Sequence, residues 1–271
     1  MNSNNIPKVI VVGDCFIDYW WLGRRRGPSA EQTGVDVVDI VKEIRCHGGA
    51  ENVAENLKYL GAQVVKILPG GYKPVKNRLM MDGVQVARWD ENDYCESIGE
   101  GRLQEGVELC TFSPSVVVSD YNKGSVGEAL RGDLQKLKSN VGIYIDTKKD
   151  PSWFGLDDRA VFFPNLKEYE QYKEQYDSIQ HVFVTLGERG IRKLVYGNSV
   201  DYCPQKYIKQ EVKSVCGAGD IVVAAMVYSQ AVDTGYTPIE FTMAAAAVGV
   251  EKICTPVVNI QEVYERLKVC Q

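Results

Sequence analysis

The sequence predicts an α/β protein with a mostly parallel central sheet, helices on both faces of that sheet, and a small antiparallel sheet standing off it. Short apolar runs rich in β-branched residues alternate along the chain with segments of helical periodicity. Residues 35–46 and 76–89 instead alternate apolar with polar side chains, which is typical of half-exposed antiparallel strands. Functional groups are expected where the parallel strands end. Candidate groups at such ends are Asp14, Asp120, Asp146 and Gly187.

The elements are expected in the following order. The run KVIVVG at residues 8–13 predicts a buried first strand, and the apolar spacing of residues 49–61 predicts a helix that Gly61 ends. Further strands are expected at 63–68, 115–119, 141–146, 160–163 and 181–186, with a hairpin of 191–196 and 199–203 around Gly197-Asn198. Further helices are expected from after residue 119 to about 139, and at 165–176, 218–232, 238–253 and 260–269.

The composition of the chain argues against several classes of protein. The net charge of −5 argues against a non-specific nucleic-acid binder, which needs a basic surface. No stretch approaches the ~18 apolar residues of a membrane span, and residues 1–8 lack a cationic start and an apolar signal core. The eight cysteines form no CxxC pair, and two histidines are too few for a His-rich zinc site. We therefore expect a cytoplasmic protein that binds neither nucleic acid nor membrane.

The sharpest motif is GAGD at residues 217–220, directly before an apolar helical run. Glycines let the backbone approach a ligand, and the first N–H groups of a helix, together with its dipole, form an anion site. A carboxylate at this site suits transfer of a phosphoryl group to an alcohol, because it can accept the hydroxyl proton while the amides stabilise the phosphoryl oxygens. A helix-capping aspartate after a glycine-rich turn is the alternative. The candidate catalytic residues are Asp220 as base and Gly217, Ala218 and Gly219 as backbone donors.

Four motifs, in this order, resemble those of the ribokinase/PfkB family of sugar kinases. They are GGAENVAENL followed by LGA within residues 48–62, NLKE at 165–168, TLG at 185–187 with Gly190, and GAGD at 217–220. The resemblance runs from about residue 8 to residue 257. It implies one ribokinase-like kinase domain over residues 1–271, with a three-layer α/β/α sandwich and a small antiparallel β lid. The lid strands are expected roughly within 15–47 and 74–91.

The resemblance also implies cofactors and contacts. ATP and Mg²⁺ are expected, and Glu168 would act on Mg²⁺ through water, since Mg²⁺ usually keeps several waters. The expected nucleotide contacts are Asn165, Glu168, Thr185, Gly187 and Lys148. The expected substrate contacts are Asp14, Asp18, Gly48, Gly49 and Asn52, with Arg88 and Lys123 for a substrate phosphate.

Within the family, several segments are most similar to the kinase domain that phosphorylates D-glycero-D-manno-heptose 7-phosphate. These are GDCFIDYWWLG at 13–23, KNR at 76–78 with QVARWD at 85–90, SDYNKG at 119–124 and DTK at 146–148. The resemblance implies phosphoryl transfer to that sugar phosphate, giving the 1,7-bisphosphate. Another sugar or nucleoside kinase of the family, or a non-catalytic sugar-phosphate or nucleotide binding protein, remain the alternatives.

The chain departs from the family pattern in two places. The segment between Leu68 and Lys76 is shorter by about one helix–strand unit. Ser214 and Cys216 stand where the family has an Asp and a Thr that help to bind a monovalent cation, so a potassium requirement is not implied. Because an uncovered sheet edge or face tends to find a partner, the lid is a candidate surface for a homodimer.

Overall fold

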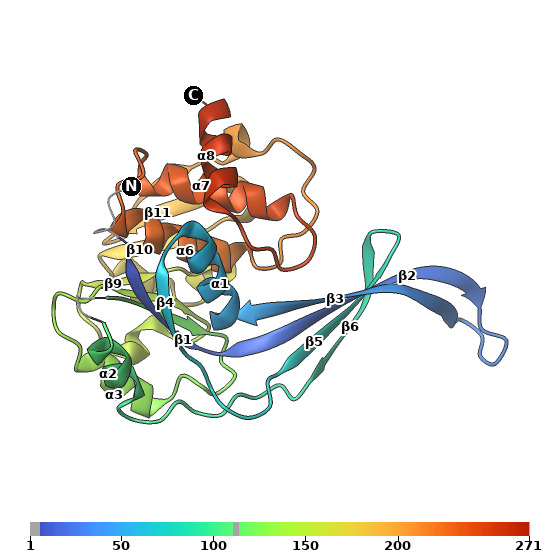
Figure 1. The fold of residues 1–271 in the computed structure, drawn as a ribbon, viewed down its shortest axis with the longest axis horizontal. Helices are drawn as coiled ribbons and strands as arrows, with labels where there is room; N and C mark the ends of the chain where they lie inside the picture. Colours follow the sequence, from blue (N-terminus) through green and yellow to red (C-terminus); the bar gives the residue numbers. More distant parts are fainter. Residues whose placement is uncertain (1–5, 111–113, 271) are drawn as a thin grey trace.

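The computed structural model describes residues 6–110 and 114–270, in which a central sheet lies between two layers of helices and a second sheet projects away from it (Figure 1). The central sheet has eight strands, and all neighbours from β4 to β10 are parallel, whereas β11 and β12 are antiparallel. Across the sheet the strands are β12 (Asn198–Tyr202), β11 (Ile191–Val195), β10 (His181–Thr185), β9 (Ala160–Phe162), β8 (Ile143–Thr147), β7 (Ser115–Asp120), β1 (Lys8–Gly13) and β4 (Gln63–Ile67).

The alternation of side chains along the central strands builds two separate cores. Val9 and Val11 of β1 pack into one core, while Ile10 and Val12 pack into the other, because successive side chains of a strand point to opposite faces. The first core is covered by α1 (Ala50–Leu60), α6 (Ala218–Ala231), α7 (Pro238–Val250) and α8 (Ile260–Val269). The second is covered by α2 (Arg102–Glu108), α3 (Glu128–Gln135), α4 (Leu166–Gln171) and α5 (Lys173–Asp177).

Three helical regions differ from the sequence-based expectation. The helix expected from after residue 119 to about 139 is shorter, because α3 spans only Glu128–Gln135 and residues 121–127 form a loop. The helix predicted at 165–176 is broken at Tyr172, whose φ of −123° and ψ of 39° are not helical, so it becomes α4 and α5. Helix α2 was not predicted, because Gly101 and Gly106 weaken the helical signal of this short segment. The expected α/β/α sandwich is otherwise confirmed.

The lid is a four-stranded sheet in the order β3, β2, β5, β6. Its pairs β2–β3 and β5–β6 are antiparallel hairpins, but β2 pairs with β5 in parallel, from Ile17 opposite Val75 to Gly23 opposite Met81. The lid is therefore mostly, not wholly, antiparallel, because the first strands of the two hairpins leave the body side by side in one direction. Its strands are β2 (Cys15–Pro28), β3 (Asp36–Gly49), β5 (Val75–Met81) and β6 (Val84–Glu91).

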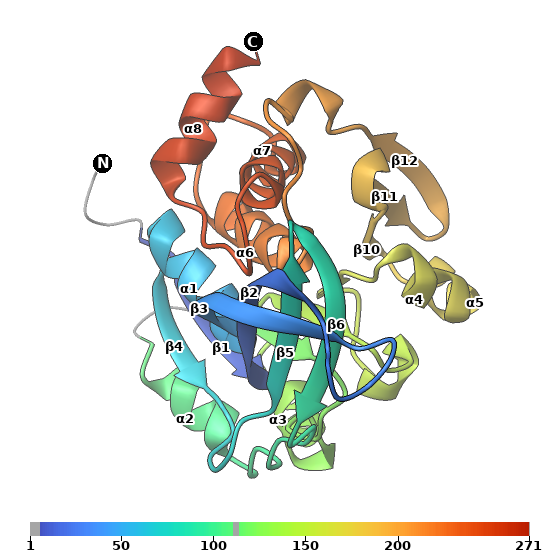
Figure 2. The same cartoon turned by 90° about the vertical axis from the view of Figure 1, so that its right-hand side faces the viewer.

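The lid joins the body at the carboxyl end of β1. Strand β2 begins at Cys15, two residues after β1 ends, and β3 runs directly into α1 at Ala50. Figure 2 views the molecule from the lid side, where β2, β3, β5 and β6 lie in front of the body. None of the helices in the described part of the chain is long and apolar enough to cross a bilayer.

Candidate active site

The first turn of α6 carries a buried carboxylate, Asp220, which is 2% exposed. Its Oδ2 accepts a hydrogen bond from Asn52 Nδ2 at 2.7 Å, and its Oδ1 accepts one from the Tyr121 hydroxyl at 3.0 Å. Burial raises the pKa of Asp220 to about 6, although both hydrogen bonds and the charge of Lys76 act in the opposite direction. An acid with this pKa is largely ionised at neutral pH and can accept a proton there.

Unpaired backbone donors lie beside this carboxylate. Gly217, with φ of 75°, caps α6, and a Cβ at this position would lie 2.8 Å from Thr255 Cγ2. Among the described residues, the N–H groups of Gly219 and Asp220 have no backbone acceptor, and no atom lies within 4 Å of the Cβ position of Gly219. The predicted anion site therefore has donors next to open space. Ala218 is an exception to the prediction, because its N–H already donates to Val215 O at 3.2 Å.

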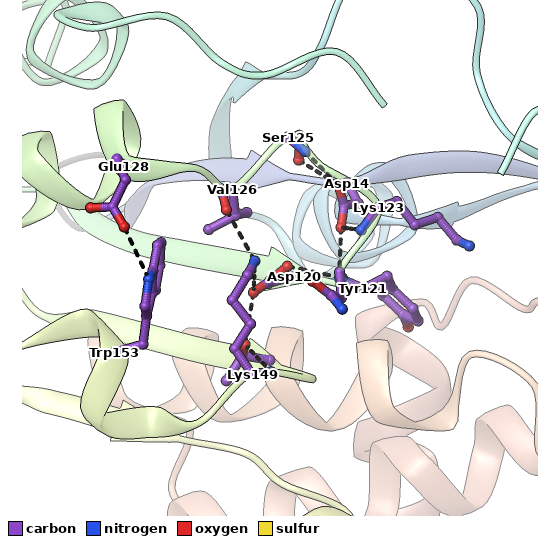
Figure 3. Close-up of polar contacts among 11 residues, drawn as sticks. Asp14, Asp120, Tyr121, Lys123, Ser125, Val126, Glu128, Lys149 and Trp153 are labelled. Atoms are coloured by element: carbon purple, nitrogen blue, oxygen red, sulfur yellow. Dashed lines mark hydrogen bonds and ion pairs between the residues drawn. The ribbon is translucent and has the colours of Figure 1, made fainter. Parts of the chain in front are cut away.

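Asp14 anchors the loop that follows β7 (Figure 3). Its Oδ2 accepts the backbone N–H groups of Tyr121 and Lys123 at 2.8 and 2.9 Å. Its Oδ1 accepts the N–H and the hydroxyl of Ser125 at 3.0 and 2.6 Å. Asp14 has no exposed surface, and its oxygens are used by the loop. Asp14 therefore helps to place Tyr121, and the expected contact of Asp14 with a sugar stays a prediction.

Gly48 and Gly49 have a packing reason for lacking side chains. A Cβ on Gly48 would lie 2.0 Å from Cε2 of Phe16, and one on Gly49 would lie 2.3 Å from the Asp14 carbonyl oxygen. Gly49 also has a φ of 64°, which favours glycine. These contacts fix the junction of β3 with α1, so the expected approach of a sugar to this backbone stays a prediction.

The expected sugar-binding side chains Asp18 and Asn52 lie close to Asp220. Asn52 is 1% exposed and donates directly to Asp220. Asp18, on β2, is 3% exposed, and its charge contributes to the raised pKa of Asp220. Asp18 Oδ1 lies 3.3 Å from an Arg78 guanidinium nitrogen, and its Oδ2 accepts the Thr255 hydroxyl at 3.2 Å. The lid and the body thus meet through polar contacts at the site.

A buried lysine of the lid faces the same region. Lys76 of β5 is 8% exposed, and its Nζ lies 3.3 Å from the centroid of the Phe16 ring and 5.0 Å from that of Tyr121. Burial, together with the charges of Lys123, Arg88 and Arg78, lowers the pKa of Lys76 to about 8, although the charge of Asp18 acts in the opposite direction. We call Lys76, Arg78, Arg88 and Lys123 the basic cluster.

The basic cluster contains both residues expected to bind a substrate phosphate. Arg88 makes two hydrogen bonds to Asp90, at 3.0 and 2.6 Å, and Lys123 pairs with Asp93. The sequence motifs did not identify Lys76 and Arg78 as site residues. Lys76 and Arg78 are two residues apart on a strand, so both side chains point to the same face of β5. This spacing was the sequence feature that could have indicated a basic site.

Asn165 and Glu168 form a capping box at the start of α4. Glu168 Oε2 accepts the Asn165 N–H at 2.9 Å, and Asn165 Oδ1 accepts the Glu168 N–H at 3.0 Å. Lys148 Nζ lies 2.5 Å from Glu168 Oε1 and 3.8 Å from Asp146 Oδ1. Thr185 pairs with Asn165 across the strand ends. Four of the five expected nucleotide contacts therefore lie together.

The fifth expected contact, Gly187, follows Thr185 by two residues. It has a φ of 62°, and no atom lies within 4 Å of its Cβ position. Glycine is therefore favoured here by the backbone, and the space beside it is open.

Carboxylates crowd the carboxyl end of β8. Burial raises the pKa of Asp146 to about 7, Lys148 opposes the rise, and the charges of Glu168, Asp220 and Asp120 add to it. A divalent cation would relieve this repulsion, and oxygen ligands are those Mg²⁺ prefers. Within residues 6–110 and 114–270, however, no three His, Cys, Asp or Glu side chains are grouped so that they could hold a metal ion. The residues fit an ion held mainly by water and phosphate oxygens.

The site combines a buried acid at the start of a helix, unpaired amides beside that acid, and two nearby lysines, Lys76 and Lys148. This arrangement is that of a phosphotransferase. Residues 153–257, which contain the capping box and the GAGD motif, match the model of the pfkB family carbohydrate kinases. Over these residues the chain is similar to the pfkB family carbohydrate kinases, a family of phosphotransferases with an alcohol group as acceptor that use ATP, generally with Mg²⁺.

Similar sequences cover almost the whole chain. It is 29% identical over 306 residues to the bifunctional protein HldE of Campylobacter jejuni strain RM1221, covering 96% of this chain and 65% of that protein. It is 29% identical over 311 residues to the bifunctional protein HldE of Helicobacter pylori strain G27, covering 95% and 66%. The chain thus spans slightly less than two thirds of the length of these relatives.

Solved structures show the same fold. The ribokinase of Arabidopsis thaliana complexed with ribose and ATP matches with a TM-score of 0.70 and 16% identity, over 97% of this chain and 99% of that one. Phosphofructokinase-2 of Escherichia coli in complex with potassium matches with a TM-score of 0.70 and 15% identity, over 98% and 99%.

Proposed function

We propose that the protein is an ATP-dependent kinase that transfers the γ-phosphoryl group to a hydroxyl of a sugar phosphate, specifically D-glycero-D-manno-heptose 7-phosphate, giving the 1,7-bisphosphate. The observation that carries this proposal is the Asp220 carboxylate, which Asn52 and Tyr121 hold beside the unpaired N–H groups at the start of α6. The similarity to the HldE proteins and the resemblance of the lid segments support the choice of sugar.

The proposed reaction uses the site as follows. The sugar hydroxyl oxygen attacks the γ-phosphorus, its proton passes to Asp220, and the bond to the ADP oxygen breaks. The N–H groups of Gly219 and Asp220 stabilise negative charge on the phosphoryl oxygens. Bound Mg²⁺ would neutralise phosphate charge, with Glu168 acting on it through water. Asn165, Lys148, Thr185 and Gly187 are the proposed nucleotide contacts.

The basic cluster supports an acceptor that carries a phosphate of its own. Lys76 is a buried ammonium group for which no carboxylate or carbonyl partner is found among the described residues. Because burying a charge without a partner is costly, this position is explained best by an anionic ligand between the lid and the body. Arg88 and Lys123 would add to the attraction.

The test compares acceptors and a base variant. With Mg²⁺–ATP and potassium present, ADP release is measured for heptose 7-phosphate, fructose 6-phosphate, ribose, fructose and adenosine. We expect the highest kcat/KM with heptose 7-phosphate. A preference for an unphosphorylated sugar or a nucleoside would overturn the substrate assignment, and ligand binding without turnover would indicate a binding protein.

The Asp220→Asn variant is expected to lose a factor of about 10²–10⁴ in kcat, because it removes the proton acceptor. The exposed Asp233, which accepts the Gly235 N–H in a loop after α6, provides the control Asp233→Asn, with activity unchanged. Turnover of Asp220→Asn close to that of the unaltered protein would refute the mechanism.

A further inference from the structure

Tyr121 lies in the short loop after β7 and makes a direct contact with Asp220. Its hydroxyl donates to Asp220 Oδ1 at 3.0 Å, while Asn52 holds the other oxygen. Burial raises the pKa of Tyr121 well above its ordinary value, and the charges of Asp220 and Asp146 act in the same direction. The phenol therefore keeps its proton throughout the working pH range and remains a donor to the carboxylate.

The backbone of this loop is fixed close to Tyr121. Asp14 accepts the N–H of Tyr121 at 2.8 Å, and the N–H of Asn122 donates to Asp120 Oδ1 at 2.9 Å. Asp120 is in turn held by the Lys149 ammonium group at 2.7 Å (Figure 3). Two buried carboxylates thus fix the place from which the Tyr121 side chain extends toward Asp220.

The ring of Tyr121 is in contact with both the lid and the body. Phe16 of β2 packs edge to face against it, with ring centroids 5.0 Å apart. The ammonium groups of Lys76, on β5, and Lys148, after β8, lie 5.0 and 5.2 Å from its centroid. Cations at this range are attracted to the face of an aromatic ring. The orientation of the phenol therefore depends on lid residues as well as on the loop.

We propose that Tyr121 is a positioning residue for phosphoryl transfer: its hydroxyl fixes the orientation of the Asp220 carboxylate and keeps that carboxylate charged, ready to accept the proton of the acceptor alcohol. The catalytic part of this inference rests on the proposed function. Because Phe16 and Lys76 belong to the lid, a change in lid position reaches Asp220 through this ring.

Tyr121→Phe tests the proposal, because it removes the hydroxyl and retains the ring. The other charged groups that face Asp220 stay in place, namely Lys76 of β5, Asp18 of β2, and Asp146 and Lys148 at the end of β8. The carboxyl carbon of Asp220 is titrated by NMR in protein labelled with ¹³C-aspartate, its signal being assigned by its absence in Asp220→Asn.

We expect the midpoint of the Asp220 titration to rise by about one pH unit in Tyr121→Phe, since hydrogen bonds to charged groups are among the stronger ones. The acid limb of the pH profile of kcat should move by the same amount, so that activity below the limb falls about tenfold. Activity is expected to recover at high pH, with KM for ATP unchanged. A loss that is equal at every pH, with no shift of the titration, would overturn the proposal.

Tyr144→Phe is the matched control. Tyr144 is a buried tyrosine of β8 whose hydroxyl donates to Gln230 Oε1 at 2.8 Å. The Tyr144→Phe variant therefore loses a tyrosine hydrogen bond that does not involve Asp220. Tyr144→Phe should leave the Asp220 titration unchanged.

If Tyr121→Phe does not fold, 3,5-difluorotyrosine at position 121 replaces it. This more acidic phenol is a stronger donor, so the Asp220 midpoint should fall, and no change would overturn the proposal.

The NMR titration needs no acceptor. Suppose the Asp220 titration shifts in Tyr121→Phe, but the unaltered protein phosphorylates no acceptor. This result supports the effect of the Tyr121 hydrogen bond on Asp220 and refutes the proposed function. An unshifted titration with normal kinase activity refutes the role of Tyr121 and leaves the proposed function standing.

Discussion

Asp146 is a carboxylate whose ionisation the folded chain opposes. Its pKa is raised from an ordinary value of 3.8 to about 7, first by burial and then by neighbouring carboxylates. The folded state therefore binds this proton more tightly than the unfolded state between those two pH values. The contribution to stability is present in full below pH 4 and is lost as the pH rises to 7.

We predict that Asp146→Asn raises the free energy of unfolding at pH 8, on the order of 2 kcal/mol, and changes it little at pH 4. Urea denaturation at the two pH values measures the difference. Asp233→Asn, at an exposed loop position, should give the same small change at both. Equal effects of Asp146→Asn at pH 4 and pH 8 would contradict the electrostatic explanation.

The sequence indicated Asp220 and Tyr121 to different degrees. Asp220 lies in a motif whose glycines and following apolar helix have a direct physical meaning, so it could be proposed as a base. Tyr121 lies in an irregular loop where no periodicity says which way a side chain points. The role of Asp14 was also beyond the sequence, because a carboxylate at a strand end has the same pattern whether it binds a ligand or a loop.

At the scale of elements, the loop between β7 and α3 depends on one buried carboxylate. Asp14→Asn would replace one acceptor oxygen with an NH₂ group that faces backbone donors. We predict a loss of stability of about 2–3 kcal/mol, together with faster amide exchange in residues 119–125. Hydrogen–deuterium exchange followed by mass spectrometry measures the loop directly.

Asp133→Asn is the comparison for that experiment. Asp133 is equally buried, but its Oδ2 accepts the Gly101 N–H at the start of α2 at 2.8 Å. It should increase exchange near residue 101 and leave residues 119–125 protected. Similar exchange of the 119–125 loop in both variants would show that Asp14 has no special role in it.

The elements that the sequence predicted best are those with a local signal. The buried strands and the long helices α6, α7 and α8 have continuous apolar runs, and their existence was confirmed. The parallel pairing of β2 with β5 was not foreseen, because it joins segments about 60 residues apart and leaves no trace in the alternation of either strand. The break at Tyr172 likewise depends on its backbone angles and not on a proline or glycine.

At the scale of the whole molecule, the lid presents apolar side chains to solvent. We propose that two copies associate through their lids, because monomeric proteins rarely expose large apolar patches. Strand β6 is exposed along its whole length. The exposed apolar residues of the lid region are Val35, Val37, Ile40, Val41, Val84, Val86 and Trp89.

Sedimentation equilibrium should show a dimer for the unaltered protein. The double variant Ile40→Glu with Val86→Glu should weaken the association at least tenfold, because it buries two charges in an apolar contact. Val269→Glu, at a position on α8 that is 70% exposed, should leave it unchanged. A monomer at all concentrations would refute the proposal.

The way in which the lid is attached determines how it can deform. On one side β1 continues into β2 across a single residue, and β3 passes into α1 without a loop, so no swivelling linker separates the lid from the body there. On the other side, loops precede β5 and follow β6. A displacement of the lid tip must therefore bend β2 and β3 at the ends where they join the body. The bending strain falls on the backbone next to Asp14 and Gly49. The stiffness of this junction, and not the length of a flexible linker, therefore sets the energy needed to close the lid over the body.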